Sequence, residues 1–138
     1  MKSADQVRRE IAESWLHLAN ADFQSAEVLL AHDPPLLYPS CFHSQQAAEK
    51  YLKAYLTWHQ IEFPKTHSIA ELLALTESVD SDLSSQLSTA CALTPYGVEI
   101  RYPKEEPEPD HDEAVTALML ARQVRDAICK VLPDFTRT

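Results

Sequence analysis

Glycine is almost missing from this sequence. Gly97 is the one glycine among 138 residues, whereas prolines number nine. Sheets joined by tight turns usually need glycine at the turn positions, so its scarcity argues against a β-rich fold. The prolines lie between the periodic apolar stretches, where they separate helices without breaking them. The composition therefore predicts an all-α fold.

Long apolar runs and a cysteine framework are also missing. No run approaches the roughly 20 apolar residues that a membrane-spanning helix needs, and the first five residues lack the apolar stretch of a signal peptide. Cys41, Cys91 and Cys129 are far apart within apolar patterns. We interpret them as buried thiols in a reducing cytoplasm. We expect a single cytoplasmic domain over residues 1–138, with no membrane association.

Basic residues are the minority among the charges. The chain has 12 lysines and arginines against 21 acidic residues, a formal net charge of −9. Because cation contacts with phosphates drive most nucleic-acid binding, an acidic chain needs a local basic patch or a basic partner for that task. Residues 103–109 are rich in proline and glutamate. They form either a solvated loop or an acidic arm that meets a basic partner.

Two familiar chemical motifs are absent. A single glycine leaves no glycine-rich phosphate loop, and no His-Glu-x-x-His pattern is present. The spacing of His, Cys and acidic residues brings no three or four metal ligands together locally. The sequence therefore predicts no metal site and no cofactor.

Apolar residues recur at steps of three and four, which predicts five helices. The predicted ranges are 3–31, 40–60, 68–78, 81–94 and a last helix from about residue 110. Ser3 with Gln6 and Ser68 with Glu71 have the spacing of capping boxes. The first helix is expected to face the core with Ile11, Trp15, Ala19, Phe23, Ala26 and Leu30. Brief loops between such helices predict an up-and-down antiparallel bundle of four or five helices.

The predicted helix 40–60 is apolar over an unusually wide arc, which is typical of a central helix or of one shared between a core and an interface. We expect a homodimer from this width. A narrow polar stripe remains on the helix. Its members are His43, Gln46, Lys50, Lys53 and Thr57. They form either one side of a groove for a phosphate or nucleotide, or exposed intrahelical ion pairs with Glu49.

Residues 41–54 carry the most specific motif, in which Phe42-His43 is followed by Gln45-Gln46-Ala47 and then Glu49-Lys50. This run resembles the second-helix signature of the HEPN family. Two weaker matches agree with it in order, namely residues 64–73 around His67 and residues 100–103 with Arg101 and Tyr102. The resemblance extends from about residue 15 to residue 131.

The resemblance implies a helical bundle that is commonly a homodimer. Such proteins are often encoded beside a small nucleotidyltransferase, sometimes as a toxin–antitoxin pair. The resemblance favours a module that binds a nucleotide or another phosphate ligand. The residues proposed for this binding are His43, Gln46, Lys50, Lys53, His67, Arg101 and Tyr102. Arg101 has a second interpretation, a structural ion pair with nearby carboxylates.

Many members of the family are metal-independent ribonucleases that cleave RNA with an Arg, four to six residues, and then a His. Here nine residues separate Arg101 from His111, so the motif in its usual form is absent. Strand cleavage needs an acid or base near the 2′-hydroxyl and a cation on the phosphate, which this spacing does not guarantee. A ribonuclease toxin acting through Arg101 with His111 or His43 across a dimer cleft, with RNA as its ligand, is the first alternative. A protein that only binds other proteins is the second.

Overall fold

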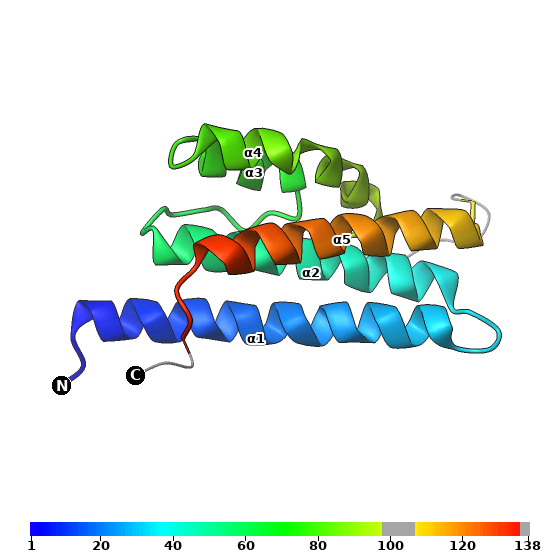
Figure 1. The fold of residues 1–138 in the computed structure, drawn as a ribbon, viewed down its shortest axis with the longest axis horizontal. Coiled ribbons are helices and arrows are strands. Elements are labelled where there is room, and N and C mark those ends of the chain that lie inside the picture. The colour runs from blue at the N-terminus through cyan, green and yellow to red at the C-terminus, as the bar shows by residue number, and fades with distance from the viewer. Residues whose placement is uncertain (98–106, 136–138) are drawn as a thin grey trace.

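The computed structural model describes residues 1–97 and 107–135, and in these ranges every regular element is a helix. The elements are α1 (Ala4–Ala31), α2 (Leu37–Trp58), α3 (Ile69–Glu77), α4 (Ser81–Gln86), a 3₁₀ helix η1 (Ser88–Tyr96) and α5 (His111–Val131). α1, α2 and α5 are the long helices, and the short ones form a separate layer in Figure 1. The predicted all-α bundle is confirmed.

α2 is the central helix, as its wide apolar arc predicts. It contacts α1, α3, η1 and α5. α1 runs antiparallel to α2, whereas α5 runs in the same direction as α2, because α3, α4 and η1 carry the chain back along the bundle (Figure 1). Both apolar faces of α2 are therefore covered within the chain, and Ala47, Tyr51 and Ala54 are all buried. The exposed apolar face from which the homodimer was predicted does not exist on α2, and the dimer itself stays a prediction.

Local capping fixes the starts of three helices where the sequence predicts them. The Gln6 amide donates to Ser3 Oγ at 3.1 Å, and the Ser3 amide donates to Gln6 Oε1 at 2.8 Å, which completes a capping box. At α3 the Glu71 amide donates to Ser68 Oγ at 3.2 Å. At α5 the Glu113 amide donates to the Asp110 carboxylate at 2.8 Å. Each contact satisfies an amide that has no partner inside its helix.

Two boundaries differ from the prediction. α2 begins at Leu37, so Pro39 lies in its first turn, where a missing amide hydrogen costs no hydrogen bond. Ser40 is not a cap; its buried hydroxyl donates to the Ala26 carbonyl at 2.8 Å and ties α2 to α1. The predicted helix 81–94 is divided, because α4 ends at Gln86 and the 3₁₀ helix η1 follows.

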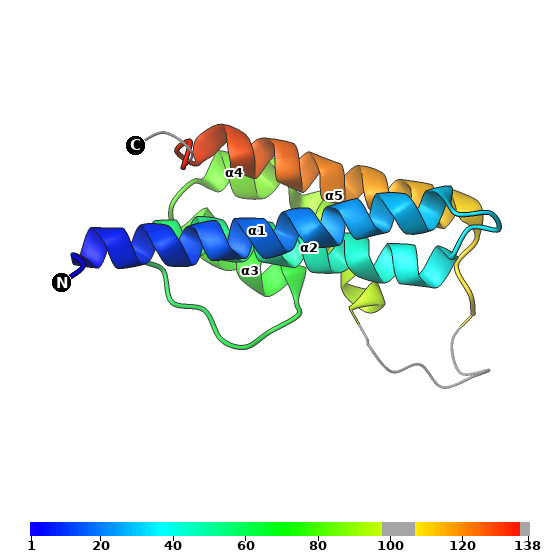
Figure 2. The same cartoon turned by 90° about the horizontal axis from the view of Figure 1, so that it is seen from below.

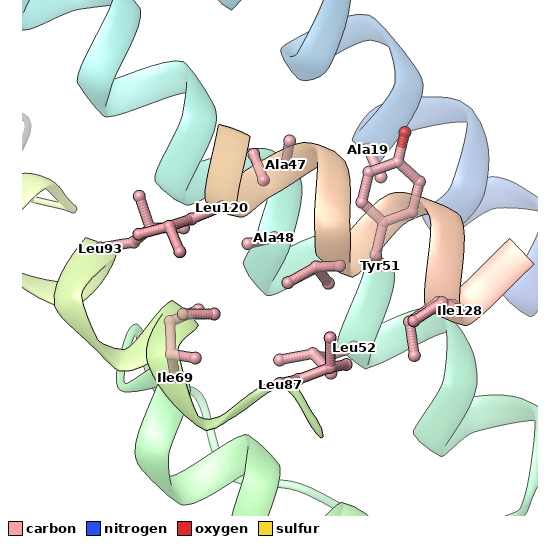
Figure 3. Packing of buried hydrophobic residues seen from close by; sticks show 14 of the residues in the cluster. Ala19, Ala47, Ala48, Tyr51, Leu52, Ile69, Leu87, Leu93, Leu120 and Ile128 are labelled. Atoms are coloured by element: carbon pink, nitrogen blue, oxygen red, sulfur yellow. The ribbon is translucent and has the colours of Figure 1, made fainter. Parts of the chain in front are cut away.

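Small side chains line the packing of α5 on α2. Ala114, Ala117 and Ala121 of α5 are buried. Ala47 and Ala48 of α2, labelled in Figure 3, are buried as well. Alanines at a helix contact let the two axes approach closely. On α1 the prediction is correct in part: Ala19, Phe23 and Ala26 are buried, but Ile11 is 47% exposed. No helix in the two described ranges is long and apolar enough to cross a bilayer.

Candidate functional site

Asp22 of α1 holds two members of the polar stripe on α2. Its Oδ1 lies 2.8 Å from His43 Nδ1, and Lys50 Nζ donates to its Oδ2 at 2.5 Å. His43 and Lys50 are seven residues apart on α2. Their side chains therefore lie on the same side of that helix, the side that faces α1. The Asp22 side chain is only 13% exposed. These three residues are called the Asp22 cluster below.

The carboxylate of Glu49, which belongs to α2 itself, also contacts one histidine and one lysine. Its Oε1 lies 2.8 Å from His67 Nδ1, and Lys53 Nζ donates to its Oε2 at 3.0 Å. The side chains of Glu49 and Lys53 are 3% and 9% exposed, whereas that of His67 is 69% exposed. His67 comes from the loop between α2 and α3, which projects on the side away from α5 in Figure 2. Glu49, Lys53 and His67 are called the Glu49 cluster.

In both clusters a carboxylate orients an imidazole. A carboxylate oxygen accepts hydrogen bonds, so Nδ1 of His43 and of His67 must donate. Nε2 is then turned away from the carboxylate, and it accepts when the ring is neutral and donates when the ring is protonated. Such a contact fixes both the tautomer and the orientation of the ring. Each cluster thus presents one defined nitrogen for a ligand.

Two glutamines extend the Glu49 cluster. Gln45 Nε2 donates to Glu49 Oε1 at 3.3 Å and to the His67 carbonyl at 3.1 Å. Gln46 Nε2 donates to Gln45 Oε1 at 2.8 Å. Gln45 is fully buried, so these contacts hold the loop residue His67 against α2. Gln45 was not among the predicted site residues, although it belongs to the same sequence motif.

Gly97 makes room for this network. A methyl group at its Cα would lie 2.9 Å from Gln45 Cδ and 3.0 Å from the two terminal atoms of that amide. The φ angle of Gly97 is −77°, which other residues also adopt, so space and not backbone freedom requires glycine here. The tertiary contact with Gln45 therefore accounts for the glycine at this position.

We expect Gly97→Ala to displace Gln45 and to destabilise the protein by about 1–3 kcal/mol, as overpacking a filled site does. Urea denaturation followed by circular dichroism measures the change. In a Gln45→Ala background the added methyl group has space, and Gly97→Ala should then change stability little. Equal effects of Gly97→Ala in the two backgrounds would contradict the contact, because uncoupled residues give additive effects.

The cysteines differ from one another in exposure. Cys41 is buried, Cys91 is half-buried and Cys129 is exposed, and all three thiols are free. The prediction of three buried thiols is therefore wrong for Cys129. Burial raises the pKa of Cys41 to about 11, with the nearby charge of Glu113 as a smaller cause. Cys41 stays protonated at neutral pH and supplies no thiolate to a reaction beside His43.

The structure brings most of the predicted ligand-binding residues into two hydrogen-bonded clusters built around α2. His43, Gln46, Lys50, Lys53 and His67 all take part through the two clusters and the glutamines.

The alternative that the stripe forms exposed intrahelical pairs does not match these contacts. Lys53 does pair with Glu49 one turn away, but both side chains are buried. Lys50 pairs with Asp22 of another helix.

The predicted catalytic candidates are less fully placed. Arg101 and Tyr102 lie outside the described residues. His111 is the first residue of α5 and is exposed. The Arg101–His111 ribonuclease alternative therefore stays a prediction. Within residues 1–97 and 107–135, no group of three or more His, Cys, Asp or Glu side chains is arranged to hold a metal ion.

Comparison with known proteins agrees with the resemblance of residues 41–54 to the HEPN signature and with the helical fold. The family model of the HEPN domain matches residues 12–132. The crystal structure of TT1696 from Thermus thermophilus is similar, with a TM-score of 0.69 and 31% sequence identity. The similarity covers 88% of this chain and 98% of that one. No curated protein matches the chain. The match over most of its length shows that the chain belongs to the HEPN family.

Proposed function

We propose that this HEPN protein is a binding module that receives a nucleotide, or another phosphate-bearing ligand, on the face formed by the Asp22 and Glu49 clusters. The observation that carries the proposal is the repeated arrangement of carboxylate, lysine and histidine. Two imidazoles, His43 of α2 and His67 of the loop that follows it, have their Nδ1 atoms held at 2.8 Å from carboxylates. A structural ion pair needs no such oriented second nitrogen.

The charges of the clusters favour an anionic ligand when the imidazoles are protonated. In each cluster the lysine balances the carboxylate, so the protonated histidine leaves one net positive charge. A protonated imidazole that donates from Nδ1 to a carboxylate donates from Nε2 to the phosphate, as a charge-assisted hydrogen bond. Gln46 adds a neutral amide beside them. The two clusters would then place local positive charge on an acidic chain.

Association with a nucleotidyltransferase is the second part of the proposal. It is supported by membership of the HEPN family together with the pairing that the resemblance implies. A reading frame for a small nucleotidyltransferase beside that of this chain, and copurification of the two products, are the expected results. Two products that never copurify would contradict this part and leave the ligand part standing.

Calorimetry with ATP as the probe tests the ligand part. Because the His67 side chain is 69% exposed, His67→Ala should leave the fold intact. Loss of one charge-assisted hydrogen bond, worth about 1.5–3 kcal/mol, should weaken ATP binding by roughly 10- to 100-fold. His17→Ala is the matched control, since His17 is also exposed but lies on α1 outside both clusters. Equal affinities of the two variants would refute the site, and no binding to the wild type would favour a protein that only binds other proteins.

A further inference from the structure

A cavity of about 580 Å³ lies between α1 and the end of α5, and its size is in the range of small-molecule sites. Its lining side chains lie between Glu13 and Asn20 on α1 and between Cys129 and Phe135 on the opposite wall. The chain leaves α5 at Val131 and crosses toward α1, where it forms part of that wall (Figure 1). No residue of the Asp22 or Glu49 cluster lines this cavity, which is called the C-terminal cavity below.

A buried tyrosine orients an amide at one end of the C-terminal cavity. Tyr51 of α2 is fully buried, and its hydroxyl donates to Asn20 Oδ1 at 2.5 Å. Because the amide oxygen of Asn20 is turned toward this hydroxyl, its Nδ2 group is turned away and keeps two hydrogens to donate. Asn20 also lines the cavity. This end therefore offers a hydrogen-bond donor to an oxygen of a ligand.

The end of α5 offers an acceptor. In a continuing helix the amide of residue 133 would bond to the carbonyl of Cys129. Residue 133 is a proline without an amide hydrogen, so the Cys129 carbonyl lacks that partner. The carbonyls of a last turn carry the negative end of the helix dipole, which favours a cation beside them. Both Cys129 and Pro133 line the cavity.

The charges near residue 13 leave one negative charge in excess. The carboxylates of Glu13 and Asp134 both line the cavity. Arg9 is the cation beside them, since its Nε donates to Glu13 Oε1 at 3.2 Å and its Nη2 donates to the Phe135 carbonyl at 2.8 Å. One guanidinium group balances one of the two carboxylates. A single further positive charge would therefore be attracted to this end of the cavity.

Apolar side chains connect the two ends of the cavity. Leu16 lies between Glu13 and Asn20 along α1, and Leu132 and Phe135 contribute to the opposite wall. Glu13 and Asn20 are seven residues apart, which is about 10 Å along a helix. The cavity therefore suits a molecule of roughly that length, with polar groups at its two ends and an apolar centre.

We infer that the C-terminal cavity binds a small amphipathic amine. The ammonium group lies toward Glu13, Asp134 and the Cys129 carbonyl. The apolar body contacts Leu16 and the opposite wall, and an oxygen at the far end accepts from Asn20 Nδ2. The apolar walls favour an organic cation over a metal ion. This site takes a cation and shares no residue with the proposed phosphate site, so either can exist without the other.

Calorimetry with tyramine as the probe tests the chemistry of the site, because tyramine carries an ammonium group and a hydroxyl at opposite ends of one apolar body. The compound 4-ethylphenol lacks the ammonium group and should bind roughly 10- to 100-fold more weakly. Phenethylamine lacks the hydroxyl and should bind roughly 2- to 10-fold more weakly. No binding of tyramine, or equal binding of tyramine and 4-ethylphenol, would overturn the inference.

Cys129 reports whether tyramine occupies this cavity. Its thiol is exposed and lines the cavity, whereas Cys91 is half-buried on η1 and does not. Saturating tyramine should slow the alkylation of Cys129 by iodoacetamide and leave the rate at Cys91 unchanged, as measured by mass spectrometry of the peptides. An unchanged rate at Cys129, or equal slowing at both cysteines, would contradict the assigned cavity.

Two glutamates of α1 provide matched variants. Glu13→Gln removes a carboxylate from the cavity and should weaken tyramine binding by roughly 10-fold or more. Glu10→Gln removes the same charge one turn away, outside the cavity, and should leave tyramine binding unchanged. The side chains of Glu13 and Glu10 are 44% and 53% exposed, so both variants should fold, which circular dichroism checks. Equal tyramine affinities of the two variants would overturn the inference, whatever the result of the ATP titrations.

Discussion

Glu49→Ala is expected to lower the free energy of unfolding by about 3–5 kcal/mol, the range found when one partner of a buried ion pair is removed. Lys53, which Glu49 contacts, is only 7% exposed, so its ammonium group would lose its counter-charge without gaining water. Glu49 also accepts from His67 and Gln45, and those contacts would be lost together. Urea denaturation at neutral pH measures the effect.

An exposed ion pair provides the control for Glu49. Lys2 and Glu10 interact at 2.8 Å, with side chains 63% and 53% exposed. Lys2→Ala should change stability by less than about 1 kcal/mol, as for other surface pairs. The double variant Glu49→Leu with Lys53→Met should recover part of the loss, because no unpaired charge is then buried. If Glu49→Ala lowers the free energy of unfolding no more than Lys2→Ala does, the Glu49 cluster is not the buried network described above.

Leu52→Ala is expected to destabilise the protein by about 2–5 kcal/mol. Leu52 lies on α2, is fully buried, and belongs to the cluster of buried side chains in Figure 3. Truncation removes buried apolar surface and leaves a cavity in the part of the core from which α2 contacts the short helices. Thermal and urea unfolding both report the change.

Val115→Ala is the matched control for the core, since Val115 is 45% exposed on α5. It should change stability by no more than about 0.5 kcal/mol. A loss below about 1 kcal/mol for Leu52→Ala would mean that the layer of short helices closes over the cavity, and would contradict tight packing on that side of α2.

Helix ends and the central place of α2 could be predicted from the sequence because both depend on nearby residues. Ser3, Ser68 and Asp110 bond to amides three positions away, so the spacing alone identifies them. The wide apolar arc of α2 likewise predicts contacts on several sides. The division of helix 81–94 was not predictable in this way, because apolar spacing does not distinguish an α-helix from a 3₁₀ helix over so few residues.

The charges of the candidate site depend on tertiary structure. The sequence shows the lysines and histidines of α2 as an open basic stripe, but their pairing with Asp22 joins residues 21 and 28 positions apart. No local pattern indicates that Asp22 faces α2. Glu49 was predicted as a partner of Lys53, and its deep burial follows only from the position of α2 at the centre of the bundle.

The face of α1 that packs against the core could not be identified from the sequence for a related reason. α1 carries two apolar repeats, and periodicity alone does not say which one the core uses. Ile11 was predicted to face the core, but the structure leaves it 47% exposed and buries Ala12 instead. The wide apolar surface of α2 is covered entirely by other helices of the same chain.

The most direct test of the proposed ligand face is to follow the imidazole signals of all six histidines by NMR while ATP is added. The account predicts that the signals of His43 and His67 move together and saturate. Those of His17 and His32, which are exposed outside the two clusters, should stay in place. Saturable shifts of His17 or His32 with none at His43 and His67 would contradict the account, and so would six signals that ATP leaves unchanged.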